Sequence, residues 1–277
     1  MSSKRFLRLG RHGLLHACLI ATAFVVLLPY LWMVTTSLKP IKLTFAPPYL
    51  IPEHFVWHNY VEAWNAAPFD RYYLNSLIMA VAIAGGQVIT SAMAAYAFDR
   101  LDFPFKNTLF FLFLATLMIP LPLLVIPSYV IIEQLGWLNT FWALIVPRLW
   151  TGFGVLLMRQ YFRTLPRELD EAAMIDGSTR FGVLFRVLLP LSRPAVATLG
   201  LFAFLFAWND FLWPLIMLDD PSRFTIQLGL ANFAGKYGTQ WVQLMAGTVT
   251  ATLPVLALFL LVQRWIIRGL TVGAINE

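Results

Sequence analysis

The chain has 277 residues, of which 59% are hydrophobic and 12% are charged, and its mean hydropathy is +0.71. These values lie far from the usual balance of soluble domains, so they exclude a soluble globular protein and indicate an integral membrane protein. The net charge is +6, and its distribution along the chain decides what it means.

Apolar stretches of transmembrane length run through most of the chain. A helix needs roughly 20 apolar residues to cross about 30 Å of hydrocarbon. A membrane barrel would instead show alternating segments of about ten residues, which the sequence lacks. We therefore expect an all-α integral membrane protein with six transmembrane helices. The predicted spans are Leu14–Thr36, Tyr72–Phe98, Leu109–Ile132, Thr140–Tyr161, Ala195–Leu218 and Val242–Ile267.

Basic residues are distributed unevenly over the segments between these spans. If the N-terminus is inside, fourteen Lys and Arg residues fall in inner segments and five in outer segments, while Arg148 lies within the fourth span. The positive-inside rule then predicts that the N- and C-termini are both cytoplasmic. This bias explains the net charge, which is therefore no evidence for nucleic-acid binding.

Two predicted outer loops are long. Residues 39–71 hold five prolines and several aromatic residues, which indicates an ordered, extended cap rather than a helix. Residues 219–241 have turn signals at both ends and a polar, glycine-rich middle. This second loop either reaches a partner outside the membrane or is a solvated connector. The chain shows no repeat or soluble domain, so we expect a single transmembrane domain over residues 1–277.

The cytoplasmic segment 163–194 is charged and amphipathic in a chain that is otherwise apolar. Pro166 suits the first turn of a helix, and acidic residues follow near its positive N-terminal end. Leu169, Ala172 and Ala173 share one face of this helix. The two alanines allow another protein surface to approach the backbone closely.

A second helix is predicted after Gly177, which breaks the first one. Ser178 is the predicted N-cap, and Pro190 and Pro194 end the helix before the next span. Four apolar residues follow the i, i+3, i+4, i+7 spacing of one helical face, namely Phe181, Leu184, Phe185 and Leu188. The segment is thus predicted to be a helix–turn–helix bracket that projects from the membrane.

The residues of the bracket leave three uses open. The bracket could be a docking site for another protein, its second helix could lie in the bilayer interface, or the bracket could pack under its own helix bundle.

The bracket resembles a known family. Glu171-Ala-Ala, then Gly177 after three residues, then Val187-Leu-Leu-Pro190 after nine match the signature of bacterial ABC importer permeases, with Val187 in place of isoleucine. Further stretches are similar to the MalG-type permeases of carbohydrate importers, namely Ser91–Phe98, Met118–Pro120, Leu157–Phe162, Ala207–Phe211 and Gly269–Gly273. The resemblance implies the type I permease fold of ABC importers.

The resemblance implies that the bracket is the coupling segment, which inserts into a groove of a cytoplasmic ATPase subunit. Glu171 would supply charge or hydrogen bonding, the alanines a close fit, and Gly177 the bend. The residues implied at this contact are Glu171, Ala172, Ala173, Asp176, Gly177, Val187 and Pro190.

The function implied by the resemblance is that of a transport subunit in the bacterial inner membrane. The chain would form half of the translocation pathway of an ATP-driven importer for a sugar or oligosaccharide. The implied partners are a second homologous permease, two cytoplasmic ATPase subunits and an extracytoplasmic solute-binding protein. The alternative is a self-sufficient secondary transporter or channel for a small polar solute.

Nothing in the sequence indicates that this chain hydrolyses ATP. Its nearest approach to a Walker A loop is Gly235-Lys236, where Tyr237 stands in place of the required Ser or Thr. The chain is therefore predicted to be no enzyme and to bind no cofactor, with ATP and Mg on the partner ATPase subunits.

Two sets of contact residues follow from the chemistry and the resemblance. In MalG-type subunits the loop between the last two spans reaches the binding protein, which implies Gly229, Asn232, Gly235, Lys236 and Tyr237. Aromatic faces and hydrogen-bonding side chains typically hold sugars, which makes the pathway candidates Trp142, Trp150, Trp208, Asn209, Asp210 and Trp213.

Arg148 and Asp210 are charged residues within predicted spans. At about 1.5 Å per residue, their distances from the outer ends of spans four and five nearly match. Because charge in hydrocarbon is costly, we predict that they pair or share a polar network that holds the helices in register. The alternative is direct contact with the sugar.

The four histidines form two pairs with a spacing compatible with metal ligation, His12 with His16 and His54 with His58. No cysteine or third ligand accompanies either pair, and Pro52 beside His54 indicates a loop. No metal site is predicted.

Overall fold

The computed structural model describes residues 3–47, 50–235 and 238–274. The chain divides into two compact units, residues 1–67 with 230–252 and residues 68–229 with 253–277. Helices α13 (Ile226–Ala231) and α14 (Trp241–Ala274) contribute to both units.

The first unit contains α1 (Ser3–Ser37), η1 (Ile41–Leu43) and α2 (His58–Asn65). Strands β1 (Ala234–Gly235) and β2 (Gly238–Thr239) pair as a short antiparallel hairpin. The prediction of an extended, non-helical cap over residues 39–71 is wrong in part, because α2 follows the last of its clustered prolines and α3 already begins at Phe69. Asn59 on α2 holds the end of α1 by donating from Nδ2 to the carbonyls of Ser37 and Lys39, at 2.8 and 2.9 Å.

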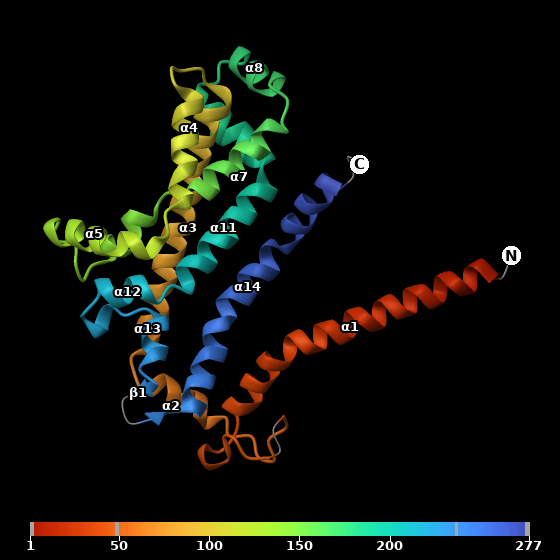
Figure 1. Cartoon of the computed structure of the whole chain (residues 1–277), viewed down its shortest axis with the longest axis vertical. Helices are drawn as coiled ribbons and strands as arrows, with labels where there is room; N and C mark the ends of the chain where they lie inside the picture. The colour runs from red at the N-terminus through yellow and green to blue at the C-terminus, as the bar shows by residue number, and fades with distance from the viewer. Residues whose placement is uncertain (1–2, 48–49, 236–237, 275–277) are drawn as a thin grey trace. The chain divides into compact units, whose positions relative to one another are not determined.

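The second unit is a bundle around α3 (Phe69–Arg100), α7 (Gly152–Arg163) and α11 (Arg193–Trp208), which lie side by side in Figure 1. Small residues permit this close packing. A Cβ atom on Gly154 of α7 would collide with Ser91 Oγ of α3 and meet the Leu199 side chain of α11 at 3.1 Å. The remaining elements are α4 (Lys106–Ala115), η2 (Thr116–Met118), α5 (Leu121–Gln134), α6 (Phe141–Ile145), η3 (Val146–Arg148), α8 (Glu168–Ile175), α9 (Arg180–Gly182), η4 (Val183–Leu188), α10 (Leu189–Leu191), α12 (Leu212–Met217) and η5 (Pro221–Arg223).

Among the described residues, three helices are long and apolar enough to cross a membrane, and three bent helix pairs raise the number of spans to as many as six. The straight candidates are Gly13–Ser37, Phe69–Arg100 and Trp241–Trp265. The helical membrane fold is thus confirmed, although three of the predicted spans are not continuous helices.

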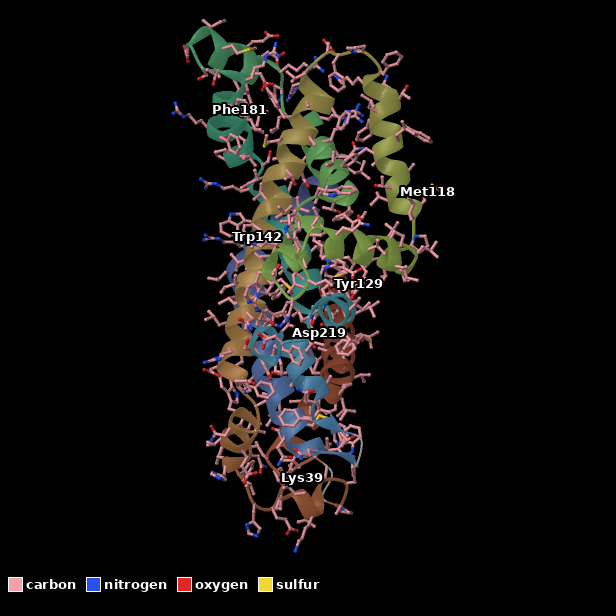
Figure 2. All side chains as sticks on the ribbon, turned by 90° about the vertical axis from the view of Figure 1, so that its left-hand side faces the viewer. Lys39, Met118, Tyr129, Trp142, Phe181 and Asp219 are labelled. Carbon is pink, nitrogen blue, oxygen red and sulfur yellow. The ribbon has the colours of Figure 1, made fainter. Side chains whose placement is uncertain are left out.

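The predicted third and fifth spans are wrong as continuous helices. The third bends by 100° between Met118 and Leu121, where Pro120 cannot continue the hydrogen-bond ladder, and Figure 2 shows the chain turning after Met118. In the fifth, α11 ends at Trp208 and α12 begins at Leu212. Pro214 explains this interruption, because its ring clashes with the carbonyl four residues earlier in a continuous helix.

The fourth span bends by 41° between η3 and α7, which frees backbone carbonyls inside the bundle. Polar side chains of α3 satisfy two of them. Gln87 donates from Nε2 to the Arg148 carbonyl at 2.9 Å, and Thr90 donates from Oγ1 to the Leu149 carbonyl at 2.6 Å. An unsatisfied carbonyl is costly away from water, so these two side chains stabilise the break.

Candidate functional site

The bracket lies at one end of the second unit, where Figure 1 shows α8 beyond the ends of α3 and α7. Helix α8 begins at Glu168, two residues after Pro166, and Gly177 follows its end with φ of +85°. Ser178 N–H donates to the Ala173 carbonyl at 2.9 Å, and Gly177 N–H donates to the Met174 carbonyl at 3.0 Å. These two bonds form a Schellman cap, so the predicted bend at Gly177 is confirmed.

The second arm of the bracket differs from the predicted α-helix. Thr179, not Ser178, is its N-cap, because Thr179 Oγ1 accepts from Gly182 N–H at 3.2 Å. The arm contains the π-helical segment η4 and continues through Pro190 to Leu191, while Pro194 lies in the first turn of α11. Pro190 thus lies within the arm, one residue before its end at Leu191, and Pro194 lies in the first turn of the next helix, where proline is tolerated.

The π-helical turn also redistributes the predicted apolar face. Leu184 and Leu188 are buried, whereas Phe181 and Phe185 are exposed. A π-helix closes i to i+5 hydrogen bonds, so the α-helical spacing no longer places all four residues on one face.

The buried face of the bracket packs under its own bundle. Leu184 and Leu188 join a core cluster with Tyr96 of α3 and with Met158 and Phe162 of α7. Packing under the bundle was one of the open uses, and for this face the structure confirms it. The opposite face remains available to another protein.

Arg100 ties α8 to the ends of α3 and α7. Its Nη2 donates to the carbonyls of Phe162 and Leu165 at 3.0 and 2.9 Å, and its Nε lies 3.1 Å from Asp170 Oδ2 on α8. Burial raises the pKa of Asp170, and the nearby Arg100 guanidinium counteracts the rise in part. Sequence reasoning missed this junction, because no local pattern indicates that the end of α3 meets α8.

The exposed face of the bracket, which we call the bracket surface, includes most of the predicted coupling residues. Ala173 and Val187 are only partly exposed, and Pro190 lies apart on the second arm. Ile175 has 86% of its surface exposed, and Phe181 has 64%. The bracket surface consists of Glu171, Ala172, Ile175, Asp176, Gly177 and Phe181.

The predicted pairing of Arg148 and Asp210 is confirmed. Arg148 Nη2 lies 2.8 Å from Asp210 Oδ2, and both side chains are nearly buried. The Arg148 guanidinium also lies over the rings of Phe206 and Trp213, at 5.0 and 5.2 Å from their centroids. Asp210 Oδ1 accepts from Trp213 N–H at 3.3 Å, so the pair stabilises the break between α11 and α12.

The predicted pathway residues divide into two groups. Trp208 and Trp213 are buried within the second unit, and Trp213 Nε1 donates to the Ala143 carbonyl at 3.0 Å. These two rings fill the core, so the prediction that they face a pathway is wrong. Trp142 and Trp150 are exposed, as is Asn209 at the end of α11, and Figure 2 shows Trp142 on the surface of the unit.

The predicted contact residues for a binding protein are also divided. Gly229 is buried, and a Cβ atom there would collide with the Tyr72 ring, so close packing rather than partner contact explains this glycine. Asn232 and Gly235 are exposed, the latter in β1. Lys236 and Tyr237 lie outside the described residues.

Metal-ligating side chains do not gather anywhere in the part of the chain that the structure describes: no group of three or more His, Cys, Asp or Glu residues is placed to hold an ion. His54 lies in the loop before α2, and His58 lies 3.7 Å from Glu62 on that helix.

A family model described as "Binding-protein-dependent transport system inner membrane component" matches residues 87–272. The chain belongs to this family. The match includes the bracket and the Arg148–Asp210 pair, and it excludes most of the first unit.

Curated relatives cover nearly the whole permease. The probable ABC transporter permease protein YurM of Bacillus subtilis is 37% identical over 260 residues, 93% of this chain and 85% of the relative. The sn-glycerol-3-phosphate transport system permease protein UgpE of Yersinia enterocolitica is 36% identical and covers 92% of this chain and 94% of its own. The arabinooligosaccharides transport system permease protein AraQ of Halalkalibacterium halodurans is 35% identical, with 92% of each covered.

Solved structures confirm the ABC importer permease fold. A chain from the crystal structure of a bacterial ABC transporter involved in the import of the acidic polysaccharide alginate superposes with a TM-score of 0.81 at 21% identity, covering 95% of this chain and 98% of that one. A second match, with a TM-score of 0.62 at 15% identity, covers 93% and 95% and comes from an alginate transporter in complex with a periplasmic protein that holds an alginate pentasaccharide.

Proposed function

We propose that this permease is one of two membrane subunits of an ATP-driven importer for a sugar or oligosaccharide. The observation that carries the proposal is the bracket surface, which exposes Glu171 and apolar side chains on a segment that packs firmly against the bundle. An ATPase groove of complementary shape would bury Ile175 and Phe181, and Glu171 would pair with a cation at its edge.

The contacts between the bracket and the bundle explain how force would reach the spans. Asp170 and Arg100 connect α8 to α3 and α7, and Leu184 and Leu188 fix the second arm in the core that α3 and α7 share. Movement of an attached ATPase subunit would therefore displace the ends of these helices together with the bracket. Because packed interfaces switch between discrete arrangements, such a displacement is a suitable trigger for alternating access.

The proposal places ATP, Mg and hydrolysis on two partner ATPase subunits. It also places both termini and the bracket in the cytoplasm, supported by the distribution of basic residues. The opposite ends of the spans would face an extracytoplasmic binding protein, with Asn232 and Gly235 as available contact residues. Trp142, Trp150 and Asn209 remain the candidates for this chain's side of the pathway.

The substrate class is supported by the relatives' names, which specify sn-glycerol-3-phosphate and arabinooligosaccharides. Arabinooligosaccharides carry many hydroxyl groups, and sn-glycerol-3-phosphate carries two beside its phosphate; hydroxyl groups suit a pathway with exposed indole and amide side chains. Thermal stabilisation of the cognate binding protein by a panel of sugars identifies the solute, and stabilisation only by a non-carbohydrate would contradict this class.

The coupling role is tested by Glu171→Ala in the reconstituted transporter. We expect solute uptake and the ATPase stimulation caused by loaded binding protein to fall at least tenfold, while membrane insertion is unchanged. Glu133→Ala, which removes an exposed glutamate on α5, is the matched control. Normal ATP-dependent uptake by the Glu171 variant would refute the proposed coupling, and uptake without any ATPase subunit would favour a secondary transporter.

A further inference from the structure

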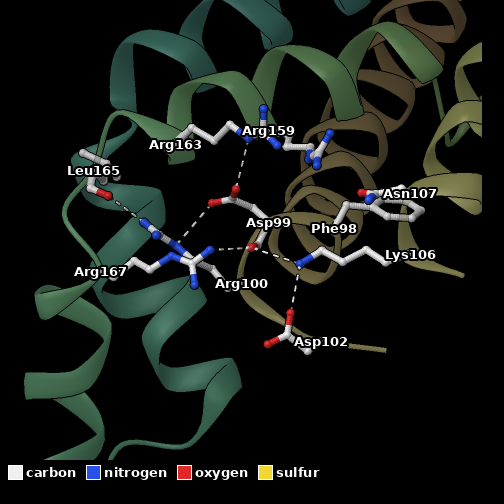
Figure 3. A pocket seen from close by; sticks show the side chains of 10 residues that line it. All are labelled: Phe98, Asp99, Arg100, Asp102, Lys106, Asn107, Arg159, Arg163, Leu165 and Arg167. Atoms are coloured by element: carbon white, nitrogen blue, oxygen red, sulfur yellow. Dashed lines mark hydrogen bonds and ion pairs between the residues drawn. The ribbon is translucent and has the colours of Figure 1, made fainter. Parts of the chain in front are cut away.

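A basic cavity of about 570 Å³ lies beside the base of the bracket, between the end of α3, the start of α4 and the end of α7 (Figure 3). It lies wholly within the second unit. Five cationic side chains and two carboxylates line it, which gives a net charge of +3. These charged residues are Asp99, Arg100, Asp102, Lys106, Arg159, Arg163 and Arg167.

The two carboxylates are already engaged by three of the cations. Asp99 lies 3.4 Å from both Arg100 Nε and Arg163 Nε, and Asp102 lies 3.5 Å from Lys106 Nζ. Arg167 donates to a neutral acceptor, the Asp99 carbonyl, at 3.3 Å, and no carboxylate of the described residues lies within ion-pair distance of it. The cavity thus retains positive charge after its internal ion pairs are formed.

Arg159 provides the strongest evidence that the cavity suits an anion. It is 93% buried and lines the cavity, and its guanidinium lies 3.8 Å from the centroid of the Phe110 ring. Its Nε atom has no hydrogen-bond partner among the described residues, and no carboxylate lies within ion-pair distance of it there. A buried guanidinium without an anion is costly, so an anion in this cavity would relieve a penalty that the fold otherwise retains.

The surroundings favour a lipid as the source of that anion. Helix α4 begins at the cavity with Lys106 and then exposes Leu109, Phe111 and Leu112 over its apolar face. Phe105, also exposed, precedes it in a left-handed conformation with φ of +59°. A phosphate in the cavity therefore has an adjoining apolar helix face along which acyl chains can lie.

We propose that this cavity binds the phosphate of an anionic phospholipid, with Arg159, Arg163, Lys106 and Arg167 as the phosphate-binding side chains and α4 as the acyl-chain surface. Under the proposed orientation this is a lipid of the cytoplasmic leaflet. The site does not depend on which solute the permease carries. It shares Arg100 with the base of the bracket, so occupancy would stabilise the junction between α8 and the bundle.

Native mass spectrometry of the full-length permease, with the subunits that co-purify, measures the binding. We expect dioleoyl phosphatidylglycerol to bind at least tenfold more tightly than dioleoyl phosphatidylcholine. Arg163→Gln and Lys106→Gln should each weaken phosphatidylglycerol binding about fivefold, since one surface cation contributes about 1 kcal/mol. Arg193→Gln removes an exposed arginine elsewhere in the second unit and should leave binding unchanged.

Arg159→Gln should weaken phosphatidylglycerol binding more than the other two variants. Thermal unfolding of this variant without lipid shows whether it is folded. If it is not, the Arg163 and Lys106 variants test the site. Inorganic phosphate is the competing probe. If inorganic phosphate alone binds the permease and displaces phosphatidylglycerol, the site binds a free anion and the lipid assignment is wrong. Equal binding of the two lipids, insensitivity to the Arg163 and Lys106 variants, or loss of the lipid on assembly with the ATPase subunits would also overturn it.

Discussion

Arg148 and Asp210 show how one charged pair can hold an irregular region of a membrane protein. The pair lies where α11 is interrupted, and Asp210 accepts from the Trp213 backbone while Arg148 covers the Trp213 ring. The carbonyl of Arg148 is in turn satisfied by Gln87 of α3. Side chains from three parts of the bundle thus converge on two neighbouring breaks.

Loss of one partner should therefore be more damaging than loss of both. Arg148→Gln should destabilise the permease by about 3–5 kcal/mol, because Asp210 remains as a buried charge without a partner. The double variant Arg148→Gln with Asp210→Asn should recover part of this loss. Thermal unfolding in detergent provides the comparison, and losses that simply add in the double variant would show that the pair does not interact energetically.

Sequence reasoning anticipated this pair because intramembrane charges are few and must be compensated. It missed Arg100 with Asp170 because both residues lie in segments where charge is ordinary. Nothing in their spacing along the chain indicates that the end of α3 meets α8. Their partnership results from the tertiary packing of α3, α7 and η4, which local pattern does not encode.

At the scale of elements, Gly177 is the residue on which the shape of the bracket depends. Its φ of +85° closes the Schellman cap of α8, and a Cβ atom there would meet no other atom within 4 Å. A substitution is therefore penalised by backbone conformation and not by collision. The left-handed region costs an ordinary residue about 1–2 kcal/mol, and asparagine tolerates it better.

Gly177→Ala should consequently reduce binding-protein-stimulated ATPase activity of the assembled transporter, while Gly177→Asn should retain more of it. The informative result is which of the two variants has the higher ATPase activity, since both add a Cβ atom to the same open space. Equal loss in both would mean that the glycine is needed for close approach of a partner instead of for its backbone conformation.

The predicted elements differ in how well local pattern determined them. The bend at Gly177 followed from one residue type with one conformational property. The π-helical turn of η4 did not, because the apolar spacing of Phe181 to Leu188 fits an α-helix equally well and only burial of Val183 and Leu188 in the core distinguishes the two. The break after Trp208 was signalled by Pro214, but the apolar composition of Ala195–Leu218 concealed it.

At the scale of the whole molecule, transport requires that a movement of the bracket be transmitted to the transmembrane spans. The second unit provides a short route. Arg100 contacts α8 by an ion pair and is itself the last residue of α3. It also donates to the Phe162 carbonyl in the last turn of α7 and to the Leu165 carbonyl just after that helix. One buried guanidinium therefore joins two spans to the docking element.

Arg100→Gln should separate docking from transport. The ATPase subunits should still co-purify, because the bracket surface is unchanged, but uptake in proteoliposomes should fall at least tenfold as α8 loses its rigid attachment. Arg100→Lys should restore only a minor part of the uptake, since one ammonium group cannot replace the planar guanidinium that reaches the Phe162 and Leu165 carbonyls and Asp170. Arg71→Gln, at the opposite end of α3, is the control for loss of one positive charge. If the Arg100 variant imports normally with its ATPase bound, force reaches the spans through the apolar contacts of η4 alone.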